Sequence, residues 1–235
     1  SVQAHRGRAL SPAHPVLHGS SQNPDVYFQA RETVNSYYAA LPGMVQECME
    51  RFAELTGRRY SPFQYEGAHD AQRVIVIMGS GAETVHETVN FLNGNGEKVG
   101  VVKVRLYRPF DPQRLLLALP ETTRQVAVLD RTKEPGADGE PLYKDIVTAL
   151  AQDSVGGNGR FSCMPLVIGG RYGLSSKEFT PGMVVAVFQE LTAEQPKNHF
   201  TIGIHDDVTH TSLAWDDMLR TSANNDTFQA VFFGL

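Results

Sequence analysis

The sequence has little cysteine, no long hydrophobic run and no strong excess of charge of one sign. Its 235 residues include two cysteines, Cys48 and Cys163, far apart in the chain. This excludes a disulfide framework, a Cys-x-x-Cys zinc motif and an iron–sulfur site built from this chain alone. No stretch approaches the roughly 18 apolar residues of a membrane span, and the N-terminus lacks the apolar run of a signal peptide. We therefore expect a soluble, cytoplasmic protein without a membrane partner.

The charge balance argues against nucleic acid as a partner. Lys and Arg number 21 against 26 Asp and Glu, which gives a net charge of -5. Such a chain has no overall attraction to polyanions. Hydrophobic residues make up 41% and charged residues 20%, as in ordinary globular proteins. The length suits one large domain or one domain with appendages.

Beyond Gln72, short runs rich in Val and Ile alternate with segments of helical period. The expected strands are residues 73–78, 98–107, 125–130, 165–168 and 200–204. Parallel strands need crossover connections, which are usually helices, and strands buried on both faces read as continuous apolar runs. The pattern predicts an α/β fold with a doubly wound, mostly parallel five-stranded sheet over 73–204.

Local signals mark where the helices begin. Ser80 with Glu83 fits a capping box, in which each side chain satisfies a backbone amide at the helix start. Asp111 and Thr180 each precede a proline, the arrangement of an N-cap followed by a first-turn proline. We expect a helix to begin at each of these three places.

The flanking regions have a different character. Residues 1–57 begin with a proline-containing segment without a regular period, expected to be extended over a neighbouring domain with a turn at Asn23-Pro24-Asp25. One amphipathic helix follows, expected to begin near Pro42 and to end at Gly57. Residues 58–72 are expected to be a linker. Residues 205–235 break the alternation of strands and helices, and their apolar end AVFFGL predicts a strand without a partner in this sequence. That ending suggests a piece of a longer protein, and the alternative is a complete chain that ends in a packed strand.

The turn Gly79-Ser80-Gly81 is the first candidate site. It follows a predicted strand and opens a predicted helix, which is the context of a dinucleotide-binding fingerprint. The third glycine of that fingerprint is missing, since Thr84 stands there. Two interpretations stay open, a tight structural turn and a ligand-phosphate site.

Basic residues at the end of the second predicted strand are the second candidate. Arg105 and Arg108 follow Lys103 near the edge where doubly wound sheets bind ligands. They could hold an anion or a carboxylate of another domain, and they could equally be ordinary interface residues.

The sequence supports neither a metal site nor a common catalytic motif. His205, Asp206, Asp207 and His210 are metal-ligand types but fall in one turn without a remote third ligand, so we expect no metal. No G-x-S-x-G elbow or P-loop lysine is recognisable.

Six strings of the sequence are more specific than any spacing. They are HPVLHGSSQNPDVYFQARE (14–32), YEGAHDAQRVIVIMGSGAETVHETV (65–89), GEKVGVVKVRLYRPFD (96–111), LDRTKEPGADGEPLYKDI (129–146), GGRYGLSSKEF (169–179) and IGIHDDVTHTSL (202–213). Together they resemble the pyruvate:ferredoxin (flavodoxin) oxidoreductase family, whose relatives include the pyruvate:NADP oxidoreductases.

The resemblance implies a segment of a much larger enzyme. Such enzymes use thiamine diphosphate, Mg²⁺, 4Fe-4S clusters and coenzyme A to convert pyruvate to acetyl-CoA and carbon dioxide, pass electrons to ferredoxin, flavodoxin or NADP, and are commonly homodimers. By this resemblance 1–57 ends a pyrimidine-binding domain, 73–204 is a domain like the transketolase C-terminal domain, and 205–235 begins the following domain. The segment alone is expected to bind none of these cofactors, to carry no catalytic residue and to act as a scaffold between cofactor domains.

Two alternatives remain from other classes of function. A stand-alone nucleotide-binding module would use the turn at Gly79 and Arg105. A protein-interaction module would bury an apolar face only against a partner.

Overall fold

The computed structural model describes residues 1–13, 15–16, 19, 21–155, 159–219 and 221. They divide into two compact units, Ser1–Leu41 and Pro42–Leu235. Within the described ranges no helix is both long and apolar enough to span a bilayer.

The first unit is helical where it was expected to be extended. It contains α1 (Val2–Arg6), α2 (Pro24–Thr33) and the first turns of α3 (Asn35–Thr56). Asn23-Pro24 begins α2, with Asp25 in its first turn, so a helix start was mistaken for an isolated turn. No described residue of this unit is buried.

Helix α3 begins earlier than predicted and ends where predicted. It starts at Asn35 and runs through Pro42, which was expected to mark its beginning. Gly57 ends it with a φ of +74°, a left-handed conformation that favours glycine. The Gly57 N–H donates to the Ala53 carbonyl at 2.8 Å, which satisfies one of the last carbonyls of the helix.

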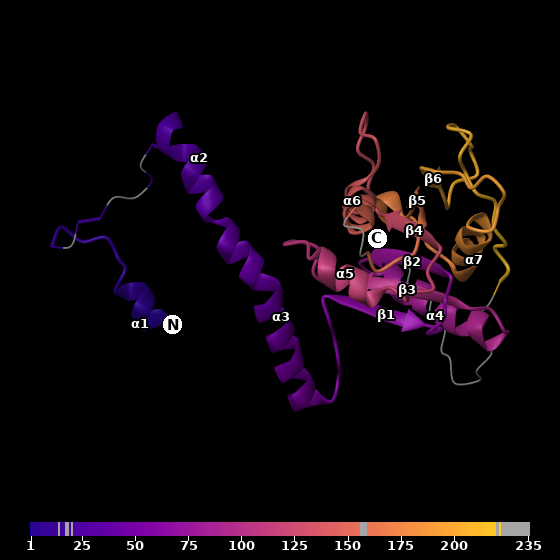
Figure 1. Ribbon diagram of the computed structural model, residues 1–235, viewed down its shortest axis with the longest axis horizontal. Helices are drawn as coiled ribbons and strands as arrows, with labels where there is room; N and C mark the ends of the chain where they lie inside the picture. Colours follow the sequence, from indigo (N-terminus) through magenta and orange to yellow (C-terminus); the bar gives the residue numbers. More distant parts are fainter. Residues whose placement is uncertain (14, 17–18, 20, 156–158, 220, 222–235) are drawn as a thin grey trace, which may run out of the picture. The chain divides into compact units, whose positions relative to one another are not determined.

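A six-stranded sheet, rather than the predicted five strands, forms the centre of the second unit (Figure 1). The strand order is β1-β3-β2-β4-β5-β6, and β2 to β6 are parallel. The bounds are β1 Phe63–Gly67, β2 Arg73–Met78, β3 Val99–Val104, β4 Gln125–Asp130, β5 Leu166–Arg171 and β6 Phe200–Thr201. The predicted α/β fold is confirmed.

The additional strand, β1, lies in the predicted linker 58–72. It pairs antiparallel with β3, and Tyr65 lies opposite Val102. A Cβ placed on Gly100 would lie 2.2 Å from the Tyr65 hydroxyl oxygen, so the ring fits only because position 100 is glycine. The interpretation of 58–72 as a linker is therefore wrong for this strand, whose sequence FQYEG lacks the β-branched residues of the other strands.

Helices cover both faces of the sheet, as the doubly wound class requires. On one face α4 (Gly81–Gly94) and α7 (Pro181–Glu190) pack in one apolar cluster, while α5 (Pro112–Ala118) and α6 (Pro141–Val155) pack in another. The strands between them are almost entirely buried, which explains their continuous Val and Ile runs.

One crossover differs in hand from its neighbours. The connections from β3 to β4, β4 to β5 and β5 to β6 all advance in the same direction along the sheet, yet α7 lies on the face of α4 rather than of α6. The β5–α7–β6 crossover therefore has the opposite hand to the β4–α6–β5 crossover. This is unusual, because about 98% of crossovers between parallel strands of one sheet are right-handed. This brings the β5–α7 loop beside the start of α4, where the ring of Tyr172 contacts Gly81.

Two of the three predicted caps are confirmed. Asp111 accepts from the Arg114 N–H at 3.1 Å, and Thr180 accepts from the Met183 N–H at 3.5 Å. The predicted capping box is wrong: Ser80 already has helical φ and ψ of -63° and -30° and makes no side-chain cap bond. The strand predicted at 230–235 lies outside the described residues.

Candidate functional site

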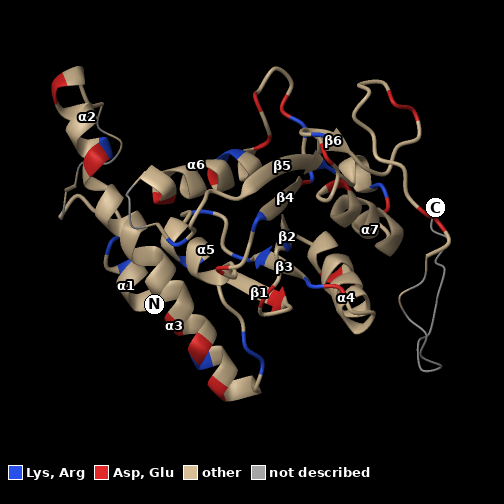
Figure 2. Ribbon diagram, turned by 45° about the vertical axis from the view of Figure 1, so that its right-hand side comes forward, with Lys and Arg blue, Asp and Glu red and all other residues tan. Residues whose placement is uncertain are grey.

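The site residues lie at the carboxyl edge of the parallel strands. From β2 the chain moves one way along the sheet to β3, and from β3 it returns past β2 to β4, so β2 and β4 flank the topological switch point. Doubly wound sheets bind ligands in the crevice at such a point. On the ribbon of Figure 2, positions of Lys and Arg (blue) and of Asp and Glu (red) both occur around the sheet.

The first hollow joins the two sequence candidates. It has a volume of about 300 Å³ and is lined by Gly79, Ala82, Glu83, Lys103, Val104 and Arg105. Gly79 follows β2 and Arg105 follows β3, so the parallel register places the glycine turn beside the basic strand end. The structure thus brings Gly79 and Arg105 to one hollow.

A buried lysine organises this hollow. Lys103 is 4% exposed, and its Nζ lies 2.7 Å from Glu83 Oε2 and 2.9 Å from His86 Nδ1. An ammonium group only donates, so His86 Nδ1 is the acceptor of this contact. The hydrogen bond from Lys103 holds the pKa of Glu83 below its usual value. Lys103 also explains the missing capping box, because it draws the Glu83 carboxylate away from the helix start.

Arg105 is anchored by residues outside the predicted site. Its Nε donates to Gln64 Oε1 at 3.0 Å, and its guanidinium carbon lies 4.7 Å from the centre of the Tyr60 ring. Arg105 Nη2 is also 3.9 Å from Glu83 Oε1. Gln64 belongs to β1, so the strand that the sequence did not reveal positions this arginine.

Arg108 does not join the hollow. Its Nη2 lies 2.6 Å from Asp145 Oδ2 on α6, and its guanidinium stacks 3.9 Å from the centre of the Tyr107 ring. Burial raises the pKa of Tyr107 to about 12. Arg108 therefore attaches the β3–α5 loop to α6.

A second hollow of about 190 Å³ lies at the switch point itself. Its lining residues are Ser80, Gly81, Thr84, Arg131, Tyr172, Lys177 and Phe179. Arg131 spans it, since Nε donates to the Gly173 carbonyl at 2.7 Å and Nη1 lies 3.4 Å from Ser80 Oγ. Neither Arg131 nor Tyr172 was among the predicted site residues.

The structure explains why both Gly79 and Gly81 of the turn are glycines. Gly79 has a φ of +81°, which a residue with a Cβ rarely adopts. A Cβ on Gly81 would lie 2.8 Å from the Tyr172 ring. A tight structural turn therefore accounts for the sequence Gly-Ser-Gly.

Beyond the switch point, Asp130 ends β4 and caps α6. Its two carboxylate oxygens accept from the Leu142 N–H at 3.0 Å and the Tyr143 N–H at 3.1 Å. Asp130 is 1% exposed, and burial raises the pKa of its carboxyl group above the ordinary value for aspartate. Asp130 thus couples a strand end to the helix that follows.

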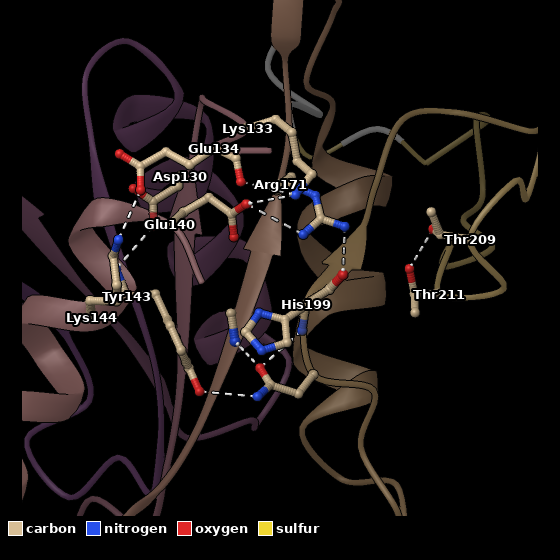
Figure 3. A network of polar contacts seen from close by, with 12 residues as sticks. Asp130, Lys133, Glu134, Glu140, Tyr143, Lys144, Arg171, His199, Thr209 and Thr211 are labelled. Atoms are coloured by element: carbon tan, nitrogen blue, oxygen red, sulfur yellow. Dashed lines mark hydrogen bonds and ion pairs between the residues drawn. The ribbon is translucent and has the colours of Figure 1, made fainter. Parts of the chain in front are cut away.

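A buried ion pair adjoins this cap (Figure 3). Glu140 is 2% exposed, and its Oε1 lies 3.4 Å from Arg171 Nη1 and 3.8 Å from Lys133 Nζ. Arg171 Nη2 donates to the His199 carbonyl at 2.8 Å. Glu140 Oε2 is buried without a hydrogen-bond partner among the described residues. Charges crowded at this strand end thus pair with one another. Glu140, Arg171 and His199 were not among the predicted site residues.

The turn at 205–210 has roles in packing. The His205 ring stacks on Trp215 at 4.5 Å, and Asp207 Oδ1 accepts from the Ser212 N–H at 2.8 Å. That bond lowers the pKa of Asp207. In the described part of the chain, no three His, Cys, Asp or Glu side chains gather as metal ligands would.

Fold and site together define a doubly wound α/β domain with charged hollows at the carboxyl edge of its sheet. Residues 71–169 match the family model described as pyruvate:ferredoxin oxidoreductase core domain II. This match includes β2 to β4 and most of β5.

Similarity extends over the whole chain. It is 63% identical over 234 residues to a pyruvate-flavodoxin oxidoreductase of Trichormus variabilis, with 100% of this chain and 19% of the relative covered. A pyruvate:ferredoxin oxidoreductase of Moorella thermoacetica is 56% identical over 100% of this chain and 19% of the relative. A probable pyruvate-flavodoxin oxidoreductase of Escherichia coli is 55% identical over 100% of this chain and 20% of the relative. The chain belongs to the pyruvate:ferredoxin (flavodoxin) oxidoreductase family, and it spans about a fifth of the length of these relatives.

Proposed function

We propose that this chain is a structural segment of a thiamine-diphosphate-dependent enzyme. That enzyme converts pyruvate and coenzyme A to acetyl-CoA and carbon dioxide and passes electrons to ferredoxin, flavodoxin or NADP. The observation that carries the proposal is the 63% identity along the whole chain to a pyruvate-flavodoxin oxidoreductase. The chain contributes a rigid α/β body between cofactor domains, within a cytoplasmic homodimer.

The residues present do not fit the iron–sulfur part of this chemistry. A 4Fe-4S cluster takes four thiolates, and the sequence has only Cys48 and Cys163, both exposed. Nor do the described residues gather a carboxylate set for Mg²⁺. In the scaffold proposal, the remaining four-fifths of a full-length relative supplies these ligands.

The scaffold proposal is tested by grafting this chain into a relative. We would replace the matching segment of the Trichormus variabilis enzyme with it and measure pyruvate-dependent dye reduction with thiamine diphosphate, Mg²⁺ and coenzyme A. The graft is expected to retain turnover, and this chain alone is expected to show none. Turnover by the isolated chain would contradict the scaffold role.

A matched pair of grafts separates folding from chemistry. Ala127 in β4 is 0% exposed, so Ala127→Asp should abolish both folding and turnover, because an unpaired carboxylate would be buried. Glu54 on α3 is exposed, and Glu54→Gln should leave both unchanged. Loss of turnover in the Gln variant with intact folding would point to chemistry within the segment.

We further propose that the first two hollows receive a carboxylate or phosphate from another domain or ligand. Gly79, Ser80, Gly81 and Arg105 would contact it, and Arg108 would act as an inter-domain contact. Support comes from the shared hollow of Gly79 and Arg105 and from its buried Lys103. Calorimetric titration of the chain with NADP or coenzyme A tests the free-ligand form. Micromolar binding lost in Arg105→Ala would favour a nucleotide site, and no heat at millimolar ligand would favour an inter-domain contact.

A further inference from the structure

A third cavity lies at the carboxyl ends of β5 and β6, beyond the two hollows described above. Its volume is about 260 Å³. It is lined by Lys133, Arg171, Tyr172, Gly173, Leu174, Lys177, Thr201, Ile202, Ile204, Val208 and Thr209. Drug-sized ligands occupy roughly 300–1,000 Å³, so this cavity suits a smaller molecule.

The walls of the cavity are mainly apolar. Tyr172 and Ile202 are only 2% and 3% exposed, and Leu174 and Val208 stand at the opening with 42% and 77% of their surface exposed. The two lining threonines are already paired, Thr201 with Ser212 and Thr209 with Thr211. The body of a matching ligand is therefore apolar.

Three cationic side chains border these apolar walls, namely Lys133, Arg171 and Lys177. Glu140 balances part of their charge, because it pairs with Arg171 and Lys133. Lys177 has no ion pair with any described carboxylate. The cavity therefore carries a net positive charge, which favours an anionic head group on the ligand.

Backbone strain is concentrated around the same cavity. The four described non-glycine residues with left-handed φ are Ser175, Ser176, His199 and His210, with φ of 54°, 61°, 57° and 59°. The two serines lie between the lining residues Leu174 and Lys177, and His210 follows Thr209. The His199 carbonyl accepts a hydrogen bond from Arg171. Strained residues persist where surrounding structure fixes them, and they cluster at ligand-binding sites.

We propose that this cavity binds a small monocarboxylic acid with an apolar body, of the size of hexanoate or benzoate. The apolar body rests on Tyr172 and Ile202, and the carboxylate faces the ammonium groups of Lys133 and Lys177. A lysine ammonium is a point charge on a flexible stem, and two of them suit a single carboxylate. The buried Glu140–Arg171 pair keeps the Arg171 side chain in place beneath the site.

Methyl-detected NMR titration of the full chain tests this proposal. Benzoate and hexanoate should shift the methyl signals of Ile202, Ile204 and Val208 saturably, with Kd below about 1 mM. Benzyl alcohol and hexanol, which lack the charge, should bind at least about tenfold more weakly. Absence of saturable shifts up to about 10 mM acid would overturn the proposal.

Variants locate the site. The double variant Lys133→Gln/Lys177→Gln should raise the Kd of benzoate about tenfold or more. Ile204→Trp, which fills the cavity, should abolish binding. The control Lys98→Gln changes an exposed lysine that precedes β3 at the opposite edge of the sheet and should leave the Kd unchanged. Equal weakening by the control variant, or unchanged binding in Ile204→Trp with its fold intact by circular dichroism, would overturn the proposal.

Discussion

Helices α2 and α7 have the same length and the same kind of beginning, yet they differ in burial. Each has ten residues, and each starts with a proline after an N-cap residue, Asn23 for α2 and Thr180 for α7. Helix α7 buries six of its residues between α4 and the sheet, whereas α2 buries none. The local signals that begin a helix therefore say little about whether it joins a core.

The spacing of apolar residues explains why the sequence predicted one helix and not the other. In α7, Val184, Val187 and Phe188 recur at helical spacing. In α2, Val26, Tyr27 and Phe28 are consecutive and point in different directions around the helix. Isolated helices of ten residues are marginal in water, so packing stabilises α7 in a way that the described contacts do not provide for α2.

The largest difference in stability between α7 and α2 is expected when one phenylalanine in each helix is replaced by alanine. Phe188 on α7 is 2% exposed and Phe28 on α2 is 72% exposed. Phe188→Ala should lower the free energy of unfolding by about 3–5 kcal/mol, because it removes buried apolar surface and leaves a cavity. Phe28→Ala should change it by less than about 0.5 kcal/mol. Urea unfolding followed by circular dichroism measures both, and similar losses in the two variants would contradict the comparison.

The N-caps give the next largest difference. The Thr180 side chain accepts from the Met183 N–H, whereas Asn23 makes no side-chain cap bond. Thr180→Ala should therefore cost about 1 kcal/mol, and Asn23→Ala should cost almost nothing. The same urea experiment distinguishes them, and a loss in Asn23→Ala as large as in Thr180→Ala would show that α2 depends on its cap after all.

Much of the fold could be predicted because buried parallel strands leave a strong sequence pattern. The runs of β2 and β4 and the inward faces of α4 and α7 needed no tertiary information. β1 was not predicted from the sequence because it is a half-buried edge strand whose pairing depends on Gly100 in another strand. Its absence from the prediction also hid the anchoring of Arg105 by Gln64.

The candidate site likewise contains residues that could be predicted from the sequence and residues that could not. Gly79 and Arg105 could be placed together because parallel strands end at one edge. Glu140 and Arg171 are 31 residues apart, and nothing local indicates that they pair. The two glycines of the turn differ likewise. The positive φ of Gly79 belongs to a local turn, whereas the approach of Tyr172 to Gly81 depends on the unusual hand of the β5–α7–β6 crossover.

A smaller, pH-dependent effect is expected at Glu83. Its pKa is lowered mainly by the hydrogen bond from Lys103, so its stabilising effect is fully present above the unfolded value of 4.5 and is lost as the pH falls through the folded value. The side chain is 66% exposed, so Glu83→Gln should cost only about 0.5 kcal/mol at pH 7. The difference from the parent should shrink toward pH 3, and Glu54→Gln on exposed α3 serves as the control. A difference that grows on acidification would contradict the assigned pairing.

The smallest effect should come from removing the region that contains α2 altogether. No described residue of 1–35 is buried, and the apolar core of the sheet begins at Phe63. Deleting residues 1–35 should therefore shift the thermal midpoint by less than about 2 °C, since one kcal/mol already corresponds to roughly 2–4 °C for a domain of this size. Calorimetry of the two chains measures the shift, and limited proteolysis should cut the longer chain within 1–35 first. A loss of about 10 °C would mean several kcal/mol and would show that α2, despite its exposed surface, stabilises the α/β core as α7 does.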